Sequence, residues 1–300
     1  MVQTQRNSSF ELLRLIAQYF IVVYHILLFW FVLEGRNDNP MFFKAFWIPL
    51  HIGVILFVLI SGYFGIRTSI KGLFRIVFPM LIYGLGFYVL NQFLHGESLQ
   101  LKKLFFVSNT GYWFMRTYLY LYLVAPMINR IIPALTSKTR FLFLGILAWM
   151  SCFVGLFFDQ SFHEGYNLVH FVFLYLIGNT LYVYRDNINK VPLIGIIIAY
   201  LLVNVMSIGT WLSFIGKSFE DECWHLAFEY NSLVLIANAV LFFIPFMRIS
   251  IHSKVINSLA SSCLAIYLIH SGSLMFRGPI RDVAYWVQEY ANNRGGGKFY

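Results

Sequence analysis

The sequence predicts an all-α membrane protein, a bundle of nine to ten transmembrane helices with its N-terminus in the cytoplasm. Of its 300 residues, 59% are hydrophobic and only 12% are charged, whereas a soluble domain carries about twice that charged share. Apolar stretches of about 20 residues, the length that crosses a bilayer, recur along the whole chain. Too few polar side chains remain to cover a surface in water, which excludes a soluble enzyme, a disordered chain and a disulfide scaffold.

Nine apolar segments are predicted to span the membrane. They cover residues 10–33, 46–66, 72–95, 113–133, 141–158, 168–184, 191–215, 232–247 and 256–276. The first begins after Asn7, Ser8 and Ser9, which are favourable N-cap residues, and it has Glu11 in its opening turn. Proline lies in or near four segments, where neighbouring helices of a bundle satisfy the freed carbonyl groups. These prolines are Pro49, Pro79, Pro126 and Pro192.

Later segments carry packing and interface signals. The second ends in FVLISGYFGIR, where Ser61 and Gly62 suit close packing against another helix. The fourth opens in YWFMRTYLYLYLVAP, whose Trp and Tyr residues are typical of an aromatic belt at the membrane interface. The ninth contains SSCLAIYLIHSG, with His270 near its outer end. The sequence therefore predicts one membrane domain over residues 1–280, followed by a short polar tail over 281–300 in which a tenth helix is absent or degraded.

The distribution of charge predicts the orientation of the chain. With the N-terminus inside, the inner segments hold eleven basic residues against Asp186 alone, and the outer loops hold seven basic and ten acidic residues. A basic inner side is the positive-inside pattern of multi-pass proteins. The net charge of +9 is explained by this topology, so no nucleic-acid partner is expected. The three cysteines form no CxxC pair, and no metal site is expected.

Four polar residues of the first helix are predicted to lie on one face: Glu11, Arg14, Gln18 and His25. Their spacings of 3, 4 and 7 place them within about 60° of one another, in a stripe about 20 Å long. Ionisable groups inside a membrane are costly, so the stripe is expected to face the bundle interior or a cavity. The alternative is a structural seam, in which Glu11 pairs with Arg14 and His25 bonds to a neighbouring carbonyl.

Further candidates have both a functional and a structural interpretation. Arg116 can snorkel outward or point into a cavity, and His270 can be interfacial. Arginines of the inner segments suit bidentate phosphate binding, although positive-inside topology alone explains them. These are Arg67, Arg75, Arg130 and Arg140. His51 and His170 have no aligned polar partners, so a core or interface position is expected. Motifs for ATP hydrolysis, zinc proteolysis and a hydrolase triad are missing from the sequence.

Four segments together resemble the acyltransferase-3 family of bacterial integral-membrane acyltransferases: RNSSFELLRLIAQYFIVVYHI, FVLISGYFGI, WFMRTYLYLYLVAPMI and LASSCLAIYLIHSG. The resemblance extends from about residue 6 to residue 276. Its most specific element is an Arg and a His separated by ten residues in the first helix, here Arg14 and His25, with Glu11 before them. The resemblance implies about ten helices, a cytoplasmic N-terminus and a multi-pass protein of the bacterial cytoplasmic membrane.

The resemblance also implies an O-acyltransferase. Members of the family move an acyl group, most often acetyl, from cytoplasmic acyl-CoA to a hydroxyl of a carbohydrate, such as a capsule, an exopolysaccharide or another cell-envelope polymer. The expected co-substrate is acetyl-CoA, and the expected partners are a polysaccharide acceptor and the lipid bilayer. A homo-oligomer is compatible with the sequence.

Acyl transfer to an alcohol needs a base for the hydroxyl proton, and His25 is the natural candidate, either as general base or as nucleophile. We assign Arg14 to the CoA phosphates or the pantetheine entrance, Glu11 to the orientation of Arg14, and Gln18 to the thioester arm. The four arginines of the inner segments would hold the phosphoadenosine. The residues expected to bind the acceptor are Trp113, Arg116, His270 and Ser61.

Two other functions fit the sequence. A secondary transporter or flippase for an envelope sugar or lipid precursor fits the composition and span number equally well, but it predicts paired repeats, and no repeat is evident. A non-catalytic scaffold for envelope assembly would have no need of the costly polar stripe in the first helix.

Overall fold

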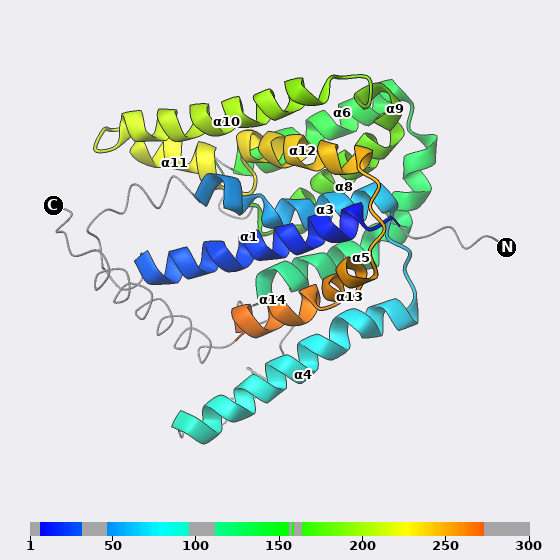
Figure 1. The fold of residues 1–300 in the computed structure, drawn as a ribbon, viewed down its shortest axis with the longest axis vertical. Coiled ribbons are helices and arrows are strands. Elements are labelled where there is room, and N and C mark those ends of the chain that lie inside the picture. The colour runs from blue at the N-terminus through cyan, green and yellow to red at the C-terminus, as the bar shows by residue number, and fades with distance from the viewer. Residues whose placement is uncertain (1–6, 32–46, 96–111, 156–157, 159–163, 273–300) are drawn as a thin grey trace.

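The computed structural model describes residues 7–31, 47–95, 112–155, 158 and 164–272 (Figure 1). Regular structure in these ranges is helical throughout, as the sequence predicts. The elements are α1 (Ser9–Phe31), α3 (Gly53–Phe64), α4 (Ile70–His95), α5 (Trp113–Ile131), η4 (Ile132–Ala134), α6 (Ser137–Ala148), η5 (Trp149–Val154), α8 (Leu168–Val183), α9 (Arg185–Ile188), α10 (Leu193–Phe214), α11 (Glu220–Phe228), α12 (Leu233–Arg248), α13 (Lys254–Ala260) and α14 (Cys263–Gly272). The predicted tail, 281–300, lies outside the described residues.

The predicted segments agree with the helices to within a few residues, with three exceptions. The second segment is divided by a turn at Ile52 into a short helical stretch over 47–51 and α3. The ninth segment is divided by a turn at Ser261 and Ser262 into α13 and α14. The short helix α11 precedes the eighth segment, where the sequence predicted only an outer loop. All three exceptions involve short helices, which a search for spans of about 20 apolar residues cannot separate.

Six segments of the described chain are long and apolar enough to cross a membrane. They are Ser9–Leu27, Trp47–Phe64, Ile70–Val89, Ser137–Val154, Leu193–Phe214 and Glu220–Arg248. The helix α8 is apolar but has 16 residues, fewer than the 17 to 25 or so that usually span a bilayer. The chain is therefore a helical membrane protein, and the count of nine to ten spans stays a prediction.

The centre of the bundle is α3, which packs against α8 and α1. Its backbone approaches that of α8 very closely, because Gly62 lies against the carbonyl of Tyr175 and Gly178 lies against the carbonyl of Leu59. A Cβ atom at either glycine would overlap the facing carbonyl oxygen. The sequence assigned Gly62 to close packing on the strength of its small size, and the structure confirms that assignment.

The first helix is anchored at its beginning. The Asn7 side chain accepts a hydrogen bond from the Ser9 amide at 3.0 Å, which pairs one of the amides left without an intrahelical partner at the start of α1. The Ser8 amide donates to the carbonyl of Ile251 at 2.6 Å, which ties the start of α1 to the segment before α13. This anchor fixes the position of α1 along its axis relative to the C-terminal helices. It therefore determines which residues of α1 and α14 contact one another.

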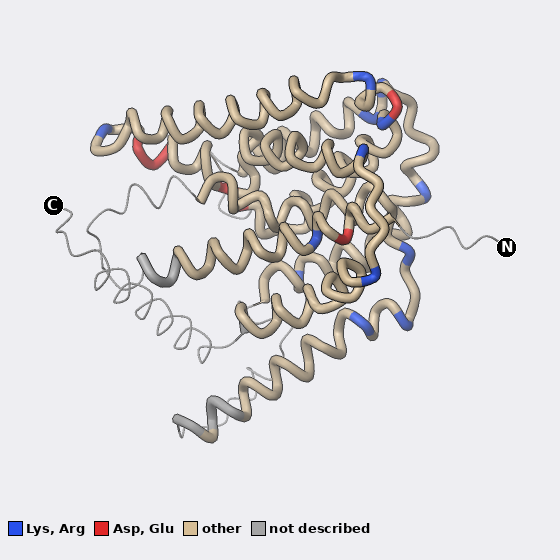
Figure 2. Tube along the Cα trace, in the orientation of Figure 1, with Lys and Arg blue, Asp and Glu red and all other residues tan. Residues whose placement is uncertain are grey.

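Charged residues are unevenly distributed between the two ends of the bundle. Figure 2 shows Lys and Arg gathered at the end where the N-terminus lies, whereas acidic residues of α11 lie at the opposite end. The helix ends and connections from α3 to α4, from α5 to α6, from α8 to α10 and from α12 to α13 hold Arg67, Lys71, Arg75, Arg130, Lys138, Arg185, Lys190, Arg248 and Lys254. The three-dimensional arrangement thus has the asymmetry from which the sequence predicted an inner and an outer side.

Candidate active site

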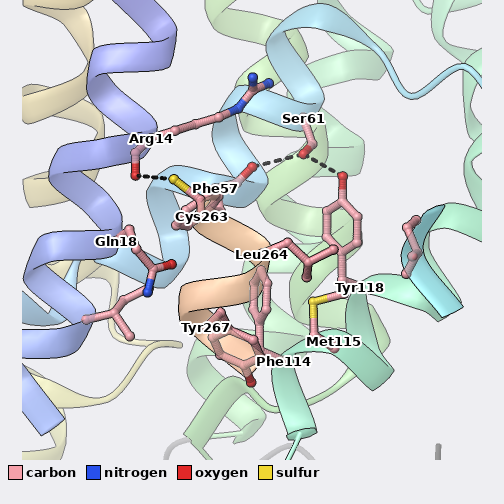
Figure 3. Close-up of a pocket in the computed structure, with 12 residues that line it drawn as sticks. Arg14, Gln18, Phe57, Ser61, Phe114, Met115, Tyr118, Cys263, Leu264 and Tyr267 are labelled. Carbon is pink, nitrogen blue, oxygen red and sulfur yellow. Dashed lines mark hydrogen bonds between the residues drawn. The ribbon is translucent and has the colours of Figure 1, made fainter. Parts of the chain in front are cut away.

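A cavity of about 250 Å³ opens beside the first half of α1 (Figure 3). Helices α1, α3, α4, α5 and α14 all contribute to its walls. The lining residues are Arg14, Gln18, Ile21, Phe57, Ser61, Ile76, Phe114, Met115, Tyr118, Cys263, Leu264 and Tyr267. Two members of the predicted polar stripe, Arg14 and Gln18, therefore face a cavity, as the cost of burying them in a membrane led us to expect.

The Arg14 guanidinium forms a close ion pair with Glu11. Nη1 of Arg14 lies 2.7 Å from both carboxylate oxygens of Glu11. The Arg14 side chain keeps 33% of its surface exposed, whereas that of Glu11 keeps 8%. Glu11 is thus buried behind the arginine and holds it in place, while the exposed part of the guanidinium stays available to an anion. The structure shows the pair that both the functional and the structural interpretation predicted.

Deeper in the same cavity, Gln18 points inward between α1 and α14 (Figure 3). Its side chain is 4% exposed, and within the described residues its Nε2 has no hydrogen-bond partner. A buried amide donor without a partner costs free energy, which a ligand carbonyl in the cavity would recover. Across the cavity, the Ser61 hydroxyl donates to the Phe57 carbonyl at 2.9 Å and accepts from the Tyr118 hydroxyl at 3.0 Å.

His25 lies one turn beyond the cavity and bonds to His270. Nδ1 of His270 is 2.7 Å from the carbonyl of Ile266, so it carries a proton and donates it. Nε2 of neutral His270 then has a lone pair, and Nδ1 of His25, 3.1 Å away, must donate to it. Neutral His25 is left with its lone pair on Nε2, the form that accepts a proton. The structure thus shows His270 in direct contact with His25, and its predicted role in acceptor binding stays a prediction.

A second cavity, of about 200 Å³, lies near the other end of the same helix. It is lined by Tyr24, Trp47, His51, Glu164, Tyr166, Trp224, His225, Phe228, Glu229 and Tyr230. Trp113, expected to bind the acceptor, stacks on Tyr166 with ring centroids 4.0 Å apart and lies 5.5 Å from Tyr230. Trp113 thus supports the wall of the second cavity, while Ser61 lines the first. Arg116 lines neither cavity.

The arginines assigned to phosphate binding fall into two groups. Arg67, Arg75 and Arg130 are exposed at the basic end of the bundle. Arg140 is 4% exposed and donates to Asn179 Oδ1 at 2.7 Å and to the Ile132 carbonyl at 3.3 Å. These contacts join α6, α8 and η4, so Arg140 takes part in helix packing, and its role in phosphate binding stays a prediction.

Several polar residues of the two cavities were missed by the sequence analysis. Tyr118 lay within the assumed aromatic belt, and His51 was expected in the core or at an interface. His225 and Glu229 belong to the unpredicted helix α11 and its end. Their four-residue spacing, HLAFE, was the available signal, since it places both on one helical face. Within the described ranges, no three His, Cys, Asp or Glu side chains converge as metal ligands.

A family model described as an acyltransferase domain, that of the acyltransferase-3 family, matches residues 7–286. No curated protein and no solved structure shows significant similarity to the chain. The matched range includes both cavities and the His25–His270 pair.

Proposed function

This chain belongs to the acyltransferase-3 family, and from that premise we propose that it is an O-acyltransferase with His25 as its general base. It moves an acyl group, most often acetyl, from cytoplasmic acyl-CoA to a hydroxyl of a cell-envelope or exported carbohydrate. The observation that carries this proposal is the hydrogen-bonded pair of His25 and His270 beside a cavity that holds Arg14 and Gln18.

The first cavity fits the donor. At about 250 Å³ it is smaller than the ~300–1,000 Å³ of most small-molecule pockets, so it suits the extended arm of a CoA thioester better than the whole nucleotide. The unpartnered Gln18 amide can donate to a carbonyl of that arm. Arg14, in the second turn of α1, can bind phosphate at the entrance of this cavity, together with the exposed Arg67, Arg75 and Arg130.

His25 performs the proton transfer in this proposal. The acyl-CoA supplies an activated thioester, and the acceptor supplies a hydroxyl that must lose its proton to attack. Nε2 of His25 takes that proton as the hydroxyl oxygen bonds to the acyl carbon, and the positive charge that develops on the ring is stabilised because Nδ1 donates to His270. The bond between the acyl carbon and sulfur then breaks, and the proton passes from His25 to the CoA thiolate, which leaves as the free thiol. The chain Ile266–His270–His25 fixes the tautomer, in the way that a carbonyl or carboxylate orients a catalytic histidine elsewhere.

The orientation of the bundle determines from which side of the membrane the acyl donor enters. We place the basic end in the cytoplasm, by the positive-inside rule, and the chain in the cell membrane as a multi-pass protein of nine to ten spans. The donor cavity then lies toward the cytoplasm, where acyl-CoA is available. Arg14 and His25 are eleven residues apart, which corresponds to about 16 Å along α1. A thioester arm that enters at Arg14 would reach toward His25 within the bundle.

The test of the proposed function follows free CoA thiol released from acetyl-CoA by the purified protein, with envelope polysaccharide extracted from the source cells as acceptor. We expect release that depends on the polysaccharide. In Arg14→Gln, we expect the half-saturating concentration of acetyl-CoA to rise about 10- to 100-fold, since a charge-assisted hydrogen bond contributes about 1.5–3 kcal/mol. Lys138→Gln, at an exposed lysine of the same end, is the matched control.

If well-folded wild-type protein neither releases thiol nor binds acetyl-CoA, the proposed function is overturned and a transporter is favoured. Equal acetyl-CoA dependence of Arg14→Gln and Lys138→Gln would remove Arg14 from the donor site while leaving the reaction in place.

His270 has its own prediction as a positioning residue. In His270→Ala the orienting acceptor for His25 Nδ1 is lost, and we expect kcat to fall about 10- to 100-fold while KM for acetyl-CoA stays constant. His270→Gln should recover part of kcat, because its Oε1 can accept the same hydrogen bond. An unchanged kcat in His270→Ala, or a loss that His270→Gln does not relieve, would contradict the positioning role.

A further inference from the structure

We propose that the second cavity is the acceptor subsite and that it binds one sugar ring of the polysaccharide, with Glu164 and Glu229 as acceptors for the ring hydroxyls. This inference rests on the proposed function, which requires a hydroxyl substrate, and it names where that substrate binds. It differs from the sequence-based expectation, which assigned the acceptor to Trp113, Arg116, His270 and Ser61.

The position of the second cavity suits an acceptor that comes from the outer side. It is lined by Tyr24, the residue next to His25 in α1. Arg14, in the donor cavity, lies ten residues before Tyr24, or about 15 Å along the helix. Along α1, His25 is thus level with the second cavity and one turn beyond Ile21, which lines the first cavity. The acidic helix α11, which supplies part of the second cavity, lies at the end of the bundle opposite the basic residues (Figure 2).

The wall of the second cavity has the chemistry that a sugar requires. Aromatic rings provide broad apolar faces for the C–H face of a pyranose, and carboxylates accept hydrogen bonds from its hydroxyls. Trp224 stacks on Phe228 with ring centroids 3.8 Å apart, and Trp47 lies 5.8 Å from Trp224, so the rings form a continuous surface. A pocket with aromatic walls and a few converging polar groups is typical of a small-molecule site.

Two buried polar atoms in this wall have no hydrogen-bond partner within the described part of the chain. They are Nδ1 of His51 and the indole Nε1 of Trp47. His51 is 9% exposed and Trp47 is 3% exposed, so neither side chain has general access to solvent. Buried polar groups in native proteins are nearly always paired. Ligand hydroxyls in the cavity would pair both groups, since a hydroxyl can donate and accept.

The two carboxylates are held by different elements. Glu229, which directly follows α11, is 8% exposed. Its Oε1 accepts a hydrogen bond from Nδ1 of His225, one turn earlier in the helix. Glu164 lies in a turn where it has a φ of 59° and Gly165 a φ of 77°. A positive φ is uncommon outside glycine and concentrates at functional sites, because the surrounding structure must maintain it.

The turn that carries Glu164 is rigidly supported. Tyr166 stacks on Trp113, and its carbonyl accepts a hydrogen bond from the Thr117 hydroxyl at 3.3 Å. Asn167 caps α8 by accepting from the His170 amide at 2.9 Å. Nδ1 of His170 is in turn 2.9 Å from the Ser151 hydroxyl in the π-helical η5. These contacts hold the turn in place before any ligand binds, which lowers the entropic cost of binding.

The experiment measures how thiol release from acetyl-CoA depends on the concentration of the extracted envelope polysaccharide. We expect Glu164→Gln and Glu229→Gln each to raise the half-saturating concentration of polysaccharide at least 10-fold, and to leave that of acetyl-CoA unchanged. Glu222→Gln is the matched control, because it removes the same charge from an exposed position of α11 outside the cavity. Glu164 is only half-buried, so Glu164→Gln is expected to fold normally. It tests the inference even if Glu229→Gln folds poorly.

Three outcomes would overturn the inference. Polysaccharide dependence in Glu164→Gln equal to that of Glu222→Gln would show that the cavity does not bind the acceptor, while the proposed function stands. An equal rise for both substrates would point to a general structural defect. Absence of turnover in the wild type would overturn the proposed function and this inference with it.

Discussion

Replacing His25 with alanine is expected to lower the rate of acyl transfer about 10²- to 10⁴-fold, the usual contribution of a general acid–base group. In the structure His25 donates to His270 and keeps its lone pair on Nε2, and alanine at this position removes that lone pair. The donor cavity is lined by other residues, and the half-saturating concentration of acetyl-CoA should change little. Thiol release from acetyl-CoA at saturating polysaccharide is the measurement.

The control for this prediction is His252→Ala, which removes an exposed imidazole near the basic end. Equal rates in the two variants would remove His25 as the base. The same preparations also test the covalent alternative, because incubation with labelled acetyl-CoA without acceptor would leave label on His25 only if it acts as nucleophile.

Adding a single methyl group at the centre of the bundle is expected to destabilise the protein strongly. In Gly62→Ala the new Cβ would overlap the carbonyl oxygen, carbonyl carbon and Cα of Tyr175. These are all backbone atoms, so the clash cannot be relieved by a change of rotamer, and α3 must move away from α8. Overpacking costs about 1–3 kcal/mol, and this site belongs at the upper end. We expect Tm in detergent to fall by about 5 °C or more.

Gly86→Ala is the matched control for this effect. Gly86 lies in α4, and a Cβ there would meet no atom within 4 Å, so its variant should be as stable as the wild type or slightly more stable, since alanine favours a helix. Equal melting temperatures for Gly62→Ala and Gly86→Ala would mean that the close approach of α3 and α8 does not limit stability.

Much of the fold could be predicted because a membrane restricts what a sequence can do. Apolar runs of about 20 residues leave few alternatives to a helix, and the nine predicted segments correspond to helices such as α1, α4 and α10. The prediction failed for α11, because this helix begins with three acidic residues and resembles an outer loop. It also failed at Ser261 and Ser262, where a local turn divides one apolar run without changing its hydropathy.

The candidate site could be predicted only where its residues lie on one helix. Glu11, Arg14 and Gln18 follow helical spacing, so periodicity alone placed them on a common face. The bond between His25 and His270 joins residues 245 positions apart, and no local pattern contains it. Arg140 illustrates the opposite case, since it resembles a phosphate-binding arginine in the sequence but bonds to Asn179 in the structure.

The sequence by itself determined that this is a helical membrane protein, that its first helix has a costly polar face, and which residues form that face. Those properties follow from hydropathy and from the repeat of a single helix, which are local. Only the tertiary structure decided that His270 hydrogen-bonds to His25, that Gln18 faces a cavity, and that Glu164 and Glu229 meet Trp47 and His51 around a second cavity. These relations depend on how separate helices pack, which is set by contacts such as that of Gly62 with Tyr175 and by the anchor of Ser8 to Ile251.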